Sequence, residues 1–171
     1  GLRRSEVLGL RWDAFNFEDK TITIKHKAIE TRKDNKRVIL LKDKTKNQSS
    51  YRTLPLVDDI IVLLKEHKKQ IGENKKLCGN SYNKKYLDYI CVDSTGKLFR
   101  PEYVTDHFTL IMKKNKNILR KITFHGLRHS CASLLLSKGI PMKEIQDWLG
   151  HSTYSTTANI YAHLEKDTKN K

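Results

Sequence analysis

Proline and glycine occur in the second half of the chain at intervals that leave room only for short helices. Pro101 suits the first position of a helix, because its missing N–H and fixed φ cost little there. Thr123 is suited to cap a second helix that Gly139 closes, and Pro141 opens a third helix that ends at Gly150. The region after residue 100 is therefore predicted to be helical, with apolar faces packed on a core.

A β-rich region precedes these helices. Residues 21–26 alternate apolar and polar side chains and are rich in β-branched residues, which predicts a strand with one face on a core. Residues 37–41 and 51–56 are two more candidate strands, and the polar residues 42–50 between them predict an exposed hairpin tip. The predicted fold class is α+β, mainly helical with a small antiparallel sheet of about three strands.

Two more helices are predicted in the first hundred residues. Residues 5–10 have the pattern of a helix end whose earlier turns precede the chain, and Asp58 and Asp59 begin a helix that Gly72 stops. Residues 73–100 are weakly periodic and predict a loop with a short helix near Tyr86. Without an internal repeat or a long linker, residues 1–171 are expected to form one domain.

The charge of the chain indicates a polyanionic partner. Lys and Arg number 34 against 19 Asp and Glu, a net charge of +15, spread over the whole length. Such an excess favours nucleic acid, although a lysine-rich surface without a partner explains it equally well. The three cysteines form no C-x-x-C pair, which excludes a zinc ribbon and favours a reducing, cytoplasmic location. No apolar run is long enough to cross a membrane.

Residues that could carry chemistry gather after residue 122. His125 and Arg128 lie three apart at a predicted helix start, where an anion is favoured and an Arg can clamp phosphate oxygens. His151 follows a helix-ending Gly, and Tyr161 lies on a last short helix. Each residue also has an interpretation without chemistry. His125 and Arg128 could form a solvated helix turn, His151 could be a loop residue that caps a carbonyl, and Tyr161 could be a core residue.

The order of four motifs resembles the tyrosine recombinase family, also called phage integrases. These are Gly-Leu-Arg-Arg-Ser-Glu at residues 1–6, a lysine-bearing hairpin, His-Gly-Leu-Arg-His at 125–129, and Leu-Gly-His-Ser at 149–152 followed by Thr-Thr and Tyr. The resemblance covers nearly the whole chain and is weakest over residues 73–100. It implies that residues 1–171 are a catalytic domain that lacks its first helices and any N-terminal DNA-clamping domain.

The resemblance also implies a role for each matched position. Arg3 and Arg128 would hold the scissile phosphate and offset the charge that grows in the transition state. His125 would assist proton transfer, and His151 would donate a hydrogen bond to the phosphate. Tyr161 would be the nucleophile, activated by these cationic neighbours.

The general acid of the family is a lysine on a β-hairpin. Lys46 matches this position best, with Lys44 as the reserve. Glu6 matches an acidic position that orients an arginine, although a plain surface pairing with Arg3 fits as well. His129 and Cys131 are expected to be packing residues and not, with His125, a metal site, because no carboxylate accompanies them.

The implied function is site-specific DNA recombination by the integrase of a phage or mobile element, through a 3′-phosphotyrosyl intermediate. No cofactor or metal is expected, because the ester to the protein stores the bond energy. The expected partners are double-stranded DNA at attachment sites, a homotetramer of the chain on that DNA, and an accessory DNA-bending protein. The alternatives are a type IB topoisomerase-like strand transferase and a DNA-binding module without catalysis.

Overall fold

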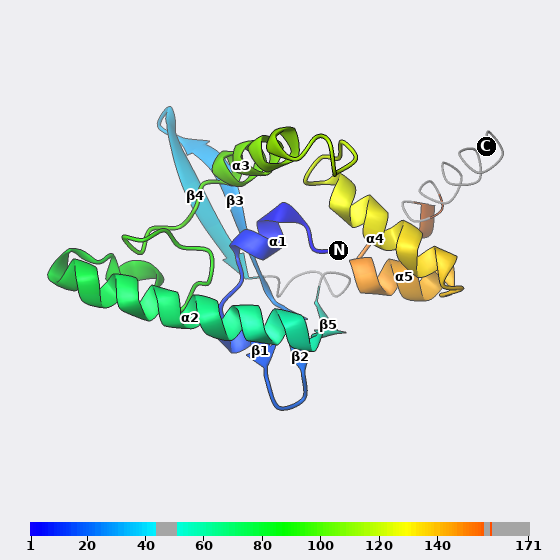
Figure 1. The fold of residues 1–171 in the computed structure, drawn as a ribbon, viewed down its shortest axis with the longest axis horizontal. Coiled ribbons are helices and arrows are strands. Elements are labelled where there is room, and N and C mark those ends of the chain that lie inside the picture. Colours follow the sequence, from blue (N-terminus) through cyan, green and yellow to red (C-terminus); the bar gives the residue numbers. More distant parts are fainter. Residues whose placement is uncertain (44–50, 156–157, 159–171) are drawn as a thin grey trace.

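The β-rich region forms two separate antiparallel sheets. A computed structural model describes residues 1–43, 51–155 and 158, and Figure 1 shows its course. The strands are β1 (Phe15–Asn16), β2 (Thr21–Ile24), β3 (His26–Lys33), β4 (Lys36–Asp43) and β5 (Arg52–Pro55). The first sheet has the order β1-β2-β5, and β3 pairs with β4 in the second.

The helices follow the strands, apart from a short one near the start of the chain. They are α1 (Arg4–Leu8), α2 (Asp58–Cys78), α3 (Pro101–Lys114), α4 (Gly126–Ser137) and α5 (Met142–Leu149), with 3-10 turns η1 (Trp12–Ala14), η3 (Gly79–Ser81) and η4 (Lys84–Tyr86). The α+β class, the helix start at Pro101 and the short helix near Tyr86 are therefore confirmed. Among the described residues, no helix combines the length and apolar character needed to cross a membrane.

The predicted hairpin between residues 37–41 and 51–56 is wrong. Strand β5 pairs with β2, with Ile22 opposite Leu54, while β4 pairs with β3, a strand that the sequence did not predict. The turn between β3 and β4 is Asp34-Asn35, and both residues have positive φ, as a two-residue type I′ hairpin requires. Polar side chains line most of β3, so it has no apolar period to reveal it.

Two predicted helix boundaries also differ from the structure. Helix α2 does not stop at Gly72 but continues to Cys78, and Gly79, with φ of 52°, ends it. A β-carbon added to Gly72 would meet nothing within 4 Å, so the residue costs only its intrinsic helix propensity. The prediction that residues 5–10 are the end of a helix with earlier turns is also wrong. Helix α1 begins at Arg4 and ends at Leu8, and Arg3 before it is extended, with ψ of 150°.

Helix α1 lies unusually close to strand β3. A β-carbon at Gly9, just after the helix, would lie 2.6 Å from the α-carbon of Lys27. Only glycine permits this approach, because real β-carbons do not come so near to backbone atoms. The contact fixes the helix that carries Glu6 against the second sheet.

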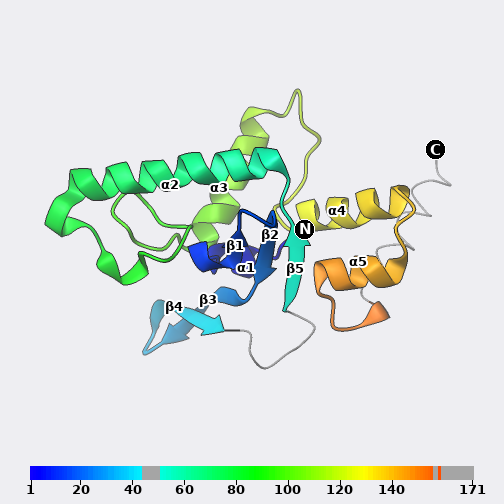
Figure 2. The ribbon, with the colours of Figure 1, turned by 90° about the horizontal axis from the view of Figure 1, so that it is seen from below.

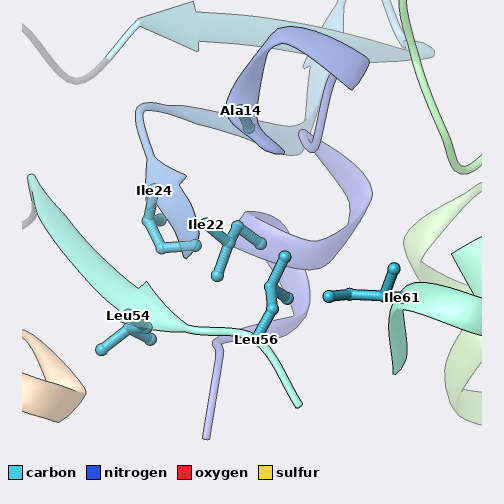
Figure 3. Packing of buried hydrophobic residues seen from close by; sticks show 6 residues of the cluster. All are labelled: Ala14, Ile22, Ile24, Leu54, Leu56 and Ile61. Carbon is cyan, nitrogen blue, oxygen red and sulfur yellow. The ribbon is translucent and has the colours of Figure 1, made fainter. Parts of the chain in front are cut away.

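Two hydrophobic clusters form the core. The first, drawn in part in Figure 3, joins one face of β2 and β5 to α2 and contains Ala14, Ile22, Ile24, Leu54, Leu56 and Ile61. The second is smaller and lies between α4 and α5, around Ala132, Ile145 and Leu149. Trp148 packs against both clusters. It therefore links the α4–α5 pair to the rest of the molecule.

Helices α4 and α5 lie side by side at one end of the molecule, away from the β3–β4 hairpin (Figures 1 and 2). Thr123 caps α4 as predicted, since its hydroxyl accepts a hydrogen bond from the Gly126 N–H at 3.0 Å. Gly139 and Gly150, with φ of 77° and 66°, follow the two helices in the left-handed region. The first residues of the chain run into the junction between this pair and the sheet.

Candidate active site

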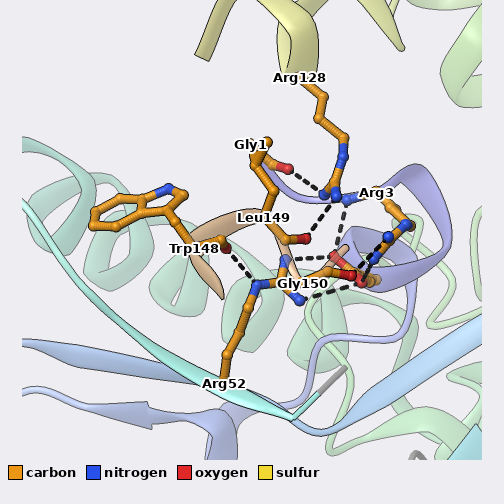
Figure 4. Close-up of polar contacts among 8 residues, drawn as sticks. Gly1, Arg3, Arg52, Arg128, Trp148, Leu149 and Gly150 are labelled. Carbon is orange, nitrogen blue, oxygen red and sulfur yellow. Dashed lines mark hydrogen bonds and ion pairs between the residues drawn. The ribbon is translucent and has the colours of Figure 1, made fainter. Parts of the chain in front are cut away.

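The C-terminal end of α5 binds three arginines from three different elements. Its last carbonyl groups have no partner within the helix and carry the negative end of the helix dipole. Arg52 Nε donates to the carbonyl oxygen of Trp148 at 2.6 Å, and an Nη of Arg128 donates to that of Leu149 at 2.6 Å. Arg3 donates to the Gly150 carbonyl at 2.8 Å. Figure 4 shows the three side chains converging on these consecutive carbonyls.

Arg3 and Glu6 bind each other at the start of α1. The Glu6 carboxylate accepts from the backbone N–H of Arg3 at 2.9 Å and from its Nη1 at 3.0 Å. The Glu6 side chain is 1% exposed, whereas that of Arg3 is 35% exposed. Glu6 is therefore not a surface partner of Arg3: it is a buried acid that orients the Arg3 guanidinium.

Arg52 is the second cation on the same carboxylate. Its Nη2 lies 2.9 Å from Oε2 of Glu6, and its Nη1 lies 3.4 Å from Oε1. Strand β5 alternates buried and exposed residues, which turns Arg52 to the buried face together with Leu54. A buried charge is tolerated only when it is paired, and Glu6 supplies the pairing.

Arg128 is 3% exposed and reaches into the same place from α4. Its second hydrogen bond runs from Nη1 to the carbonyl oxygen of Gly1, at 2.7 Å. Burial lowers the pKa of the Arg128 guanidinium to about 10, and the charges of Arg3 and Arg52 act in the same direction. The group still carries its proton at neutral pH, so three guanidiniums face one carboxylate and the cluster is net positive.

His151 follows directly after the carbonyl that Arg3 binds, and it is 7% exposed. Its backbone N–H donates to the Gln146 carbonyl at 3.0 Å, which fixes the residue to α5. Burial is the main cause, and together with the nearby charges of Arg128 and Arg3 it lowers the pKa of the imidazole to about 4. The ring is therefore neutral at neutral pH and can donate one hydrogen bond, but it holds no charge.

His125 lies apart from this cluster. It is exposed at the start of α4 and lines an open cleft of about 420 Å³ with Arg3, Ser5 and Thr105. Its ring meets the ring of His129 edge to face, with centroids 4.9 Å apart. Arg3 lines this cleft and also binds the Gly150 carbonyl at the end of α5, so it connects the cleft with the arginine cluster.

The two packing predictions near α4 have different outcomes. Cys131 packs against the second core cluster, as expected. His129 is exposed and its ring meets that of His125, so the expectation that it is a packing residue is wrong. Within the described part of the chain, no three His, Cys, Asp or Glu side chains are placed to hold a metal ion.

Three of the predicted site residues come together at the end of α5, namely Arg3, Arg128 and His151. His125 borders the adjoining cleft. Lys46, its reserve Lys44 and Tyr161 lie outside the described residues.

The sequence model of the phage integrase family matches residues 1–168. The chain belongs to this family. Among curated relatives, it is 33% identical over 169 residues to a XerC-like tyrosine recombinase of Caldanaerobacter subterraneus subsp. tengcongensis, covering 96% of the chain and 43% of that protein. It is 30% identical over 166 residues to the integrase of Staphylococcus phage L54a, covering 96% and 45%. The chain thus spans less than half the length of these relatives.

Solved structures of phage integrase relatives have the same fold. The Tn1549 transposon integrase in complex with circular intermediate DNA superposes with a TM-score of 0.73 at 21% identity, covering 96% of this chain and 55% of that one. The XerH site-specific recombinase bound to difH substrate gives 0.65 at 25% identity, covering 98% and 41%. The similarity therefore extends over the whole described fold.

The sequence motifs do not single out one member of the cluster in this integrase-family chain. The sequence pattern marks Arg52 only as a strand residue, yet it binds both Glu6 and the end of α5. A signal was present: in residues 51–56, Arg52 shares a strand face with Leu54 and Leu56. An arginine on the apolar face of a strand requires a buried acid, and Glu6 is that acid.

Proposed function

We propose that residues 1–171 are the catalytic domain of a site-specific DNA recombinase of a phage or mobile element. The observation that carries this proposal is the convergence of Arg3, Arg128 and His151 at the end of α5, because a net positive cluster with hydrogen-bond donors suits a phosphodiester. Membership of the phage integrase family supports the same reaction class.

In this proposal, Tyr161 loses its phenol proton to His125 and attacks the scissile phosphorus atom, and the bond to the 5′ oxygen breaks. The products are a 3′-phosphotyrosyl ester and a free 5′-hydroxyl, which takes its proton from Lys46. Arg3 uses two N–H donors on Glu6 and Gly150, and a guanidinium has five, so donors remain for a phosphate oxygen. Arg128 would exchange the Gly1 carbonyl for a phosphate oxygen, which is a charged acceptor and a stronger one.

The two histidines have different tasks in this scheme. His151 is neutral, so it donates a hydrogen bond to the phosphate without adding to the positive charge. His125 borders the cleft beside Arg3 and would accept the phenol proton there. The reversal of the first step on a partner strand completes recombination, with no cofactor or metal.

The proposed partners follow from the same chemistry. The enzyme would act on double-stranded DNA at attachment sites, as a homotetramer on two duplexes, with an accessory DNA-bending protein where the site requires it. The three cysteines are free, which suits a cytoplasmic enzyme.

The test is covalent trapping. Full-length protein is incubated with a duplex from the junction of element and chromosome, nicked shortly 3′ of the cleavage point so that the released fragment diffuses away. Wild type should form a protein–DNA adduct, and Tyr161→Phe should form none. An adduct with Tyr161→Phe, or no adduct with wild type, would overturn the proposal. Relaxation of plasmids that lack the site would instead identify a topoisomerase.

A further inference from the structure

Arg52 has the contacts of a residue that organises the site without touching DNA. Its side chain is 7% exposed, and all three guanidinium nitrogens are engaged, Nε on Trp148 and both Nη atoms on Glu6. The group is almost entirely withdrawn from solvent. An incoming phosphate would therefore not contact it.

The contacts of Arg52 join two parts of the site that must stay aligned. Glu6 holds Arg3 from α1, while the carbonyls after Trp148 hold Arg128 and Arg3 from the end of α5. A planar guanidinium can span a carboxylate and a carbonyl at fixed geometry, because its donors are rigidly arranged. Arg52 thus sets the position of the α5 carbonyls relative to the Glu6 carboxylate.

Arg52 also determines how strongly Glu6 binds Arg3. A buried carboxylate with a single cationic partner would draw that partner into a full two-pronged pair. Because Arg52 occupies both carboxylate oxygens, Glu6 binds Arg3 through one Nη and its backbone N–H. The remaining Arg3 donors, on a side chain that is 35% exposed, stay available to an anion.

We propose that Arg52 is a positioning residue for strand cleavage, which acts on the scissile phosphate through Arg3 and Arg128. This inference rests on the proposed function. Lysine at this position keeps a positive charge opposite Glu6 but has a single ammonium group, which cannot bridge Glu6 and Trp148 in the same way. Arg52→Lys should therefore misplace Arg3 while the buried charge stays paired.

The experiment compares two substrates in single-turnover cleavage by the full-length protein. One is the nicked junction duplex, and the other carries a neutral methylphosphonate at the scissile position. Arg52→Lys should slow cleavage of the phosphate about 10- to 100-fold, in the range for a displaced charge-stabilising donor. On the methylphosphonate its deficit should shrink to below about 3-fold, because less charge then needs to be stabilised. Arg3→Ala should show the same pattern, with a large deficit on the phosphate and a small one on the methylphosphonate.

The matched control is Arg11→Lys. Arg11 is a half-buried arginine outside the cluster, where it binds the Tyr89 hydroxyl at 2.8 Å, and its substitution should leave the ratio of the two rates unchanged. An equal deficit of Arg52→Lys on both substrates would show a merely structural role and overturn the inference.

A second variant keeps the test decisive if Arg52→Lys fails to fold. Arg52→Met combined with Glu6→Gln removes both buried charges together, which protein cores tolerate better than one unpaired charge. It should show the same substrate-dependent deficit, and equal deficits would again contradict the inference. If wild type forms no adduct on the phosphate duplex, the proposed function itself is wrong. If wild type cleaves normally and Arg52→Lys cleaves equally fast, only the inference about Arg52 is wrong.

Discussion

At the scale of single residues, the cluster at the end of α5 depends on one carboxylate. Glu6 is 1% exposed and lies between Arg3 and Arg52, so its charge compensates two guanidiniums at a place where water cannot. Burying such a group costs several kcal/mol, which its hydrogen bonds must offset. The stability of the domain and the placement of Arg3 therefore depend on the same side chain.

Replacement of Glu6 by Gln should lower the free energy of unfolding by about 3 kcal/mol, because Arg52 would stay buried without a counter-charge. Denaturant unfolding followed by tryptophan fluorescence measures this. The control is Glu102→Gln, which breaks only the exposed pair with Arg37 and should cost less than about 1 kcal/mol. Equal losses in the two variants would refute the special position of Glu6.

His151 should make the domain sensitive to mild acid. Its folded-state pKa is about 4 and its ordinary value is 6.5, so between these values the unfolded chain binds a proton that the folded chain rejects. The stability it contributes is complete above pH 6.5 and is lost as the pH falls toward 4, by up to about 3 kcal/mol. In His151→Gln the free energy of unfolding should vary less over this window, and an unchanged pH profile would contradict a neutral buried imidazole.

At the scale of secondary-structure elements, the end of α5 is shaped by Gly150. With φ of 66° and ψ of 47°, this residue turns the chain so that its own carbonyl and that of Leu149 both face arginines. A residue with a β-carbon adopts this conformation at a cost. The geometry of the α5 terminus thus follows from one glycine.

Two Gly→Ala substitutions should change stability in opposite directions. Gly150→Ala should destabilise by about 1 to 2 kcal/mol through its left-handed backbone. Gly72→Ala lies inside α2 with open space around it and should stabilise by up to about 1 kcal/mol. Thermal unfolding of the two variants beside wild type measures both effects, and shifts of the same sign would exclude this account.

The elements differ in how far the sequence reveals them. Helices with proline, glycine or threonine at their ends, such as α3, α4 and α5, are predictable because the local chemistry of a boundary is enough. Strand β3 is not, since its side chains are mostly polar and its partner β4 is fixed by the Asp34-Asn35 turn. Arg3, Arg128 and His151 are predictable from motifs, but the role of Arg52 depends on contacts 46 and 96 residues away in sequence, which no local pattern encodes.

At the scale of the whole molecule, the net charge of +15 has two parts. Arg52 and Arg128 are buried near Glu6, and most lysines among the described residues are exposed, including Lys113 and Lys116 beside a cleft of about 710 Å³ at the end of α3. Exposed lysines bind phosphates without reading bases and release counterions when they do so. Affinity for DNA should therefore depend steeply on salt, whereas the ion pairs inside the buried cluster should not weaken as the salt concentration rises.

Replacing Lys113 and Lys116 by Gln should flatten the plot of log affinity against log salt concentration by about 1.8, because each lost phosphate contact removes about 0.9 from the slope. Titration of a fluorescent duplex at several salt concentrations measures this. The same change at Lys75 and Lys76 is the control, because they end α2 at the side of the molecule away from α4 and α5 (Figure 1). A slope that changes equally in both pairs would place the DNA elsewhere.

Trp148 has a consequence for how the α4–α5 pair can separate from the sheet. Its ring packs against both core clusters while its backbone carbonyl binds Arg52. Any motion that separates α4 and α5 from the sheet must break this hydrophobic contact together with the bonds of Arg52 to Trp148 and of Arg3 to Gly150, whereas the bond of Arg128 to Leu149 stays within the helix pair. Opening of that seam and disassembly of the arginine cluster are therefore the same transition, and we expect no intermediate in which the helix pair is undocked but the cluster remains assembled.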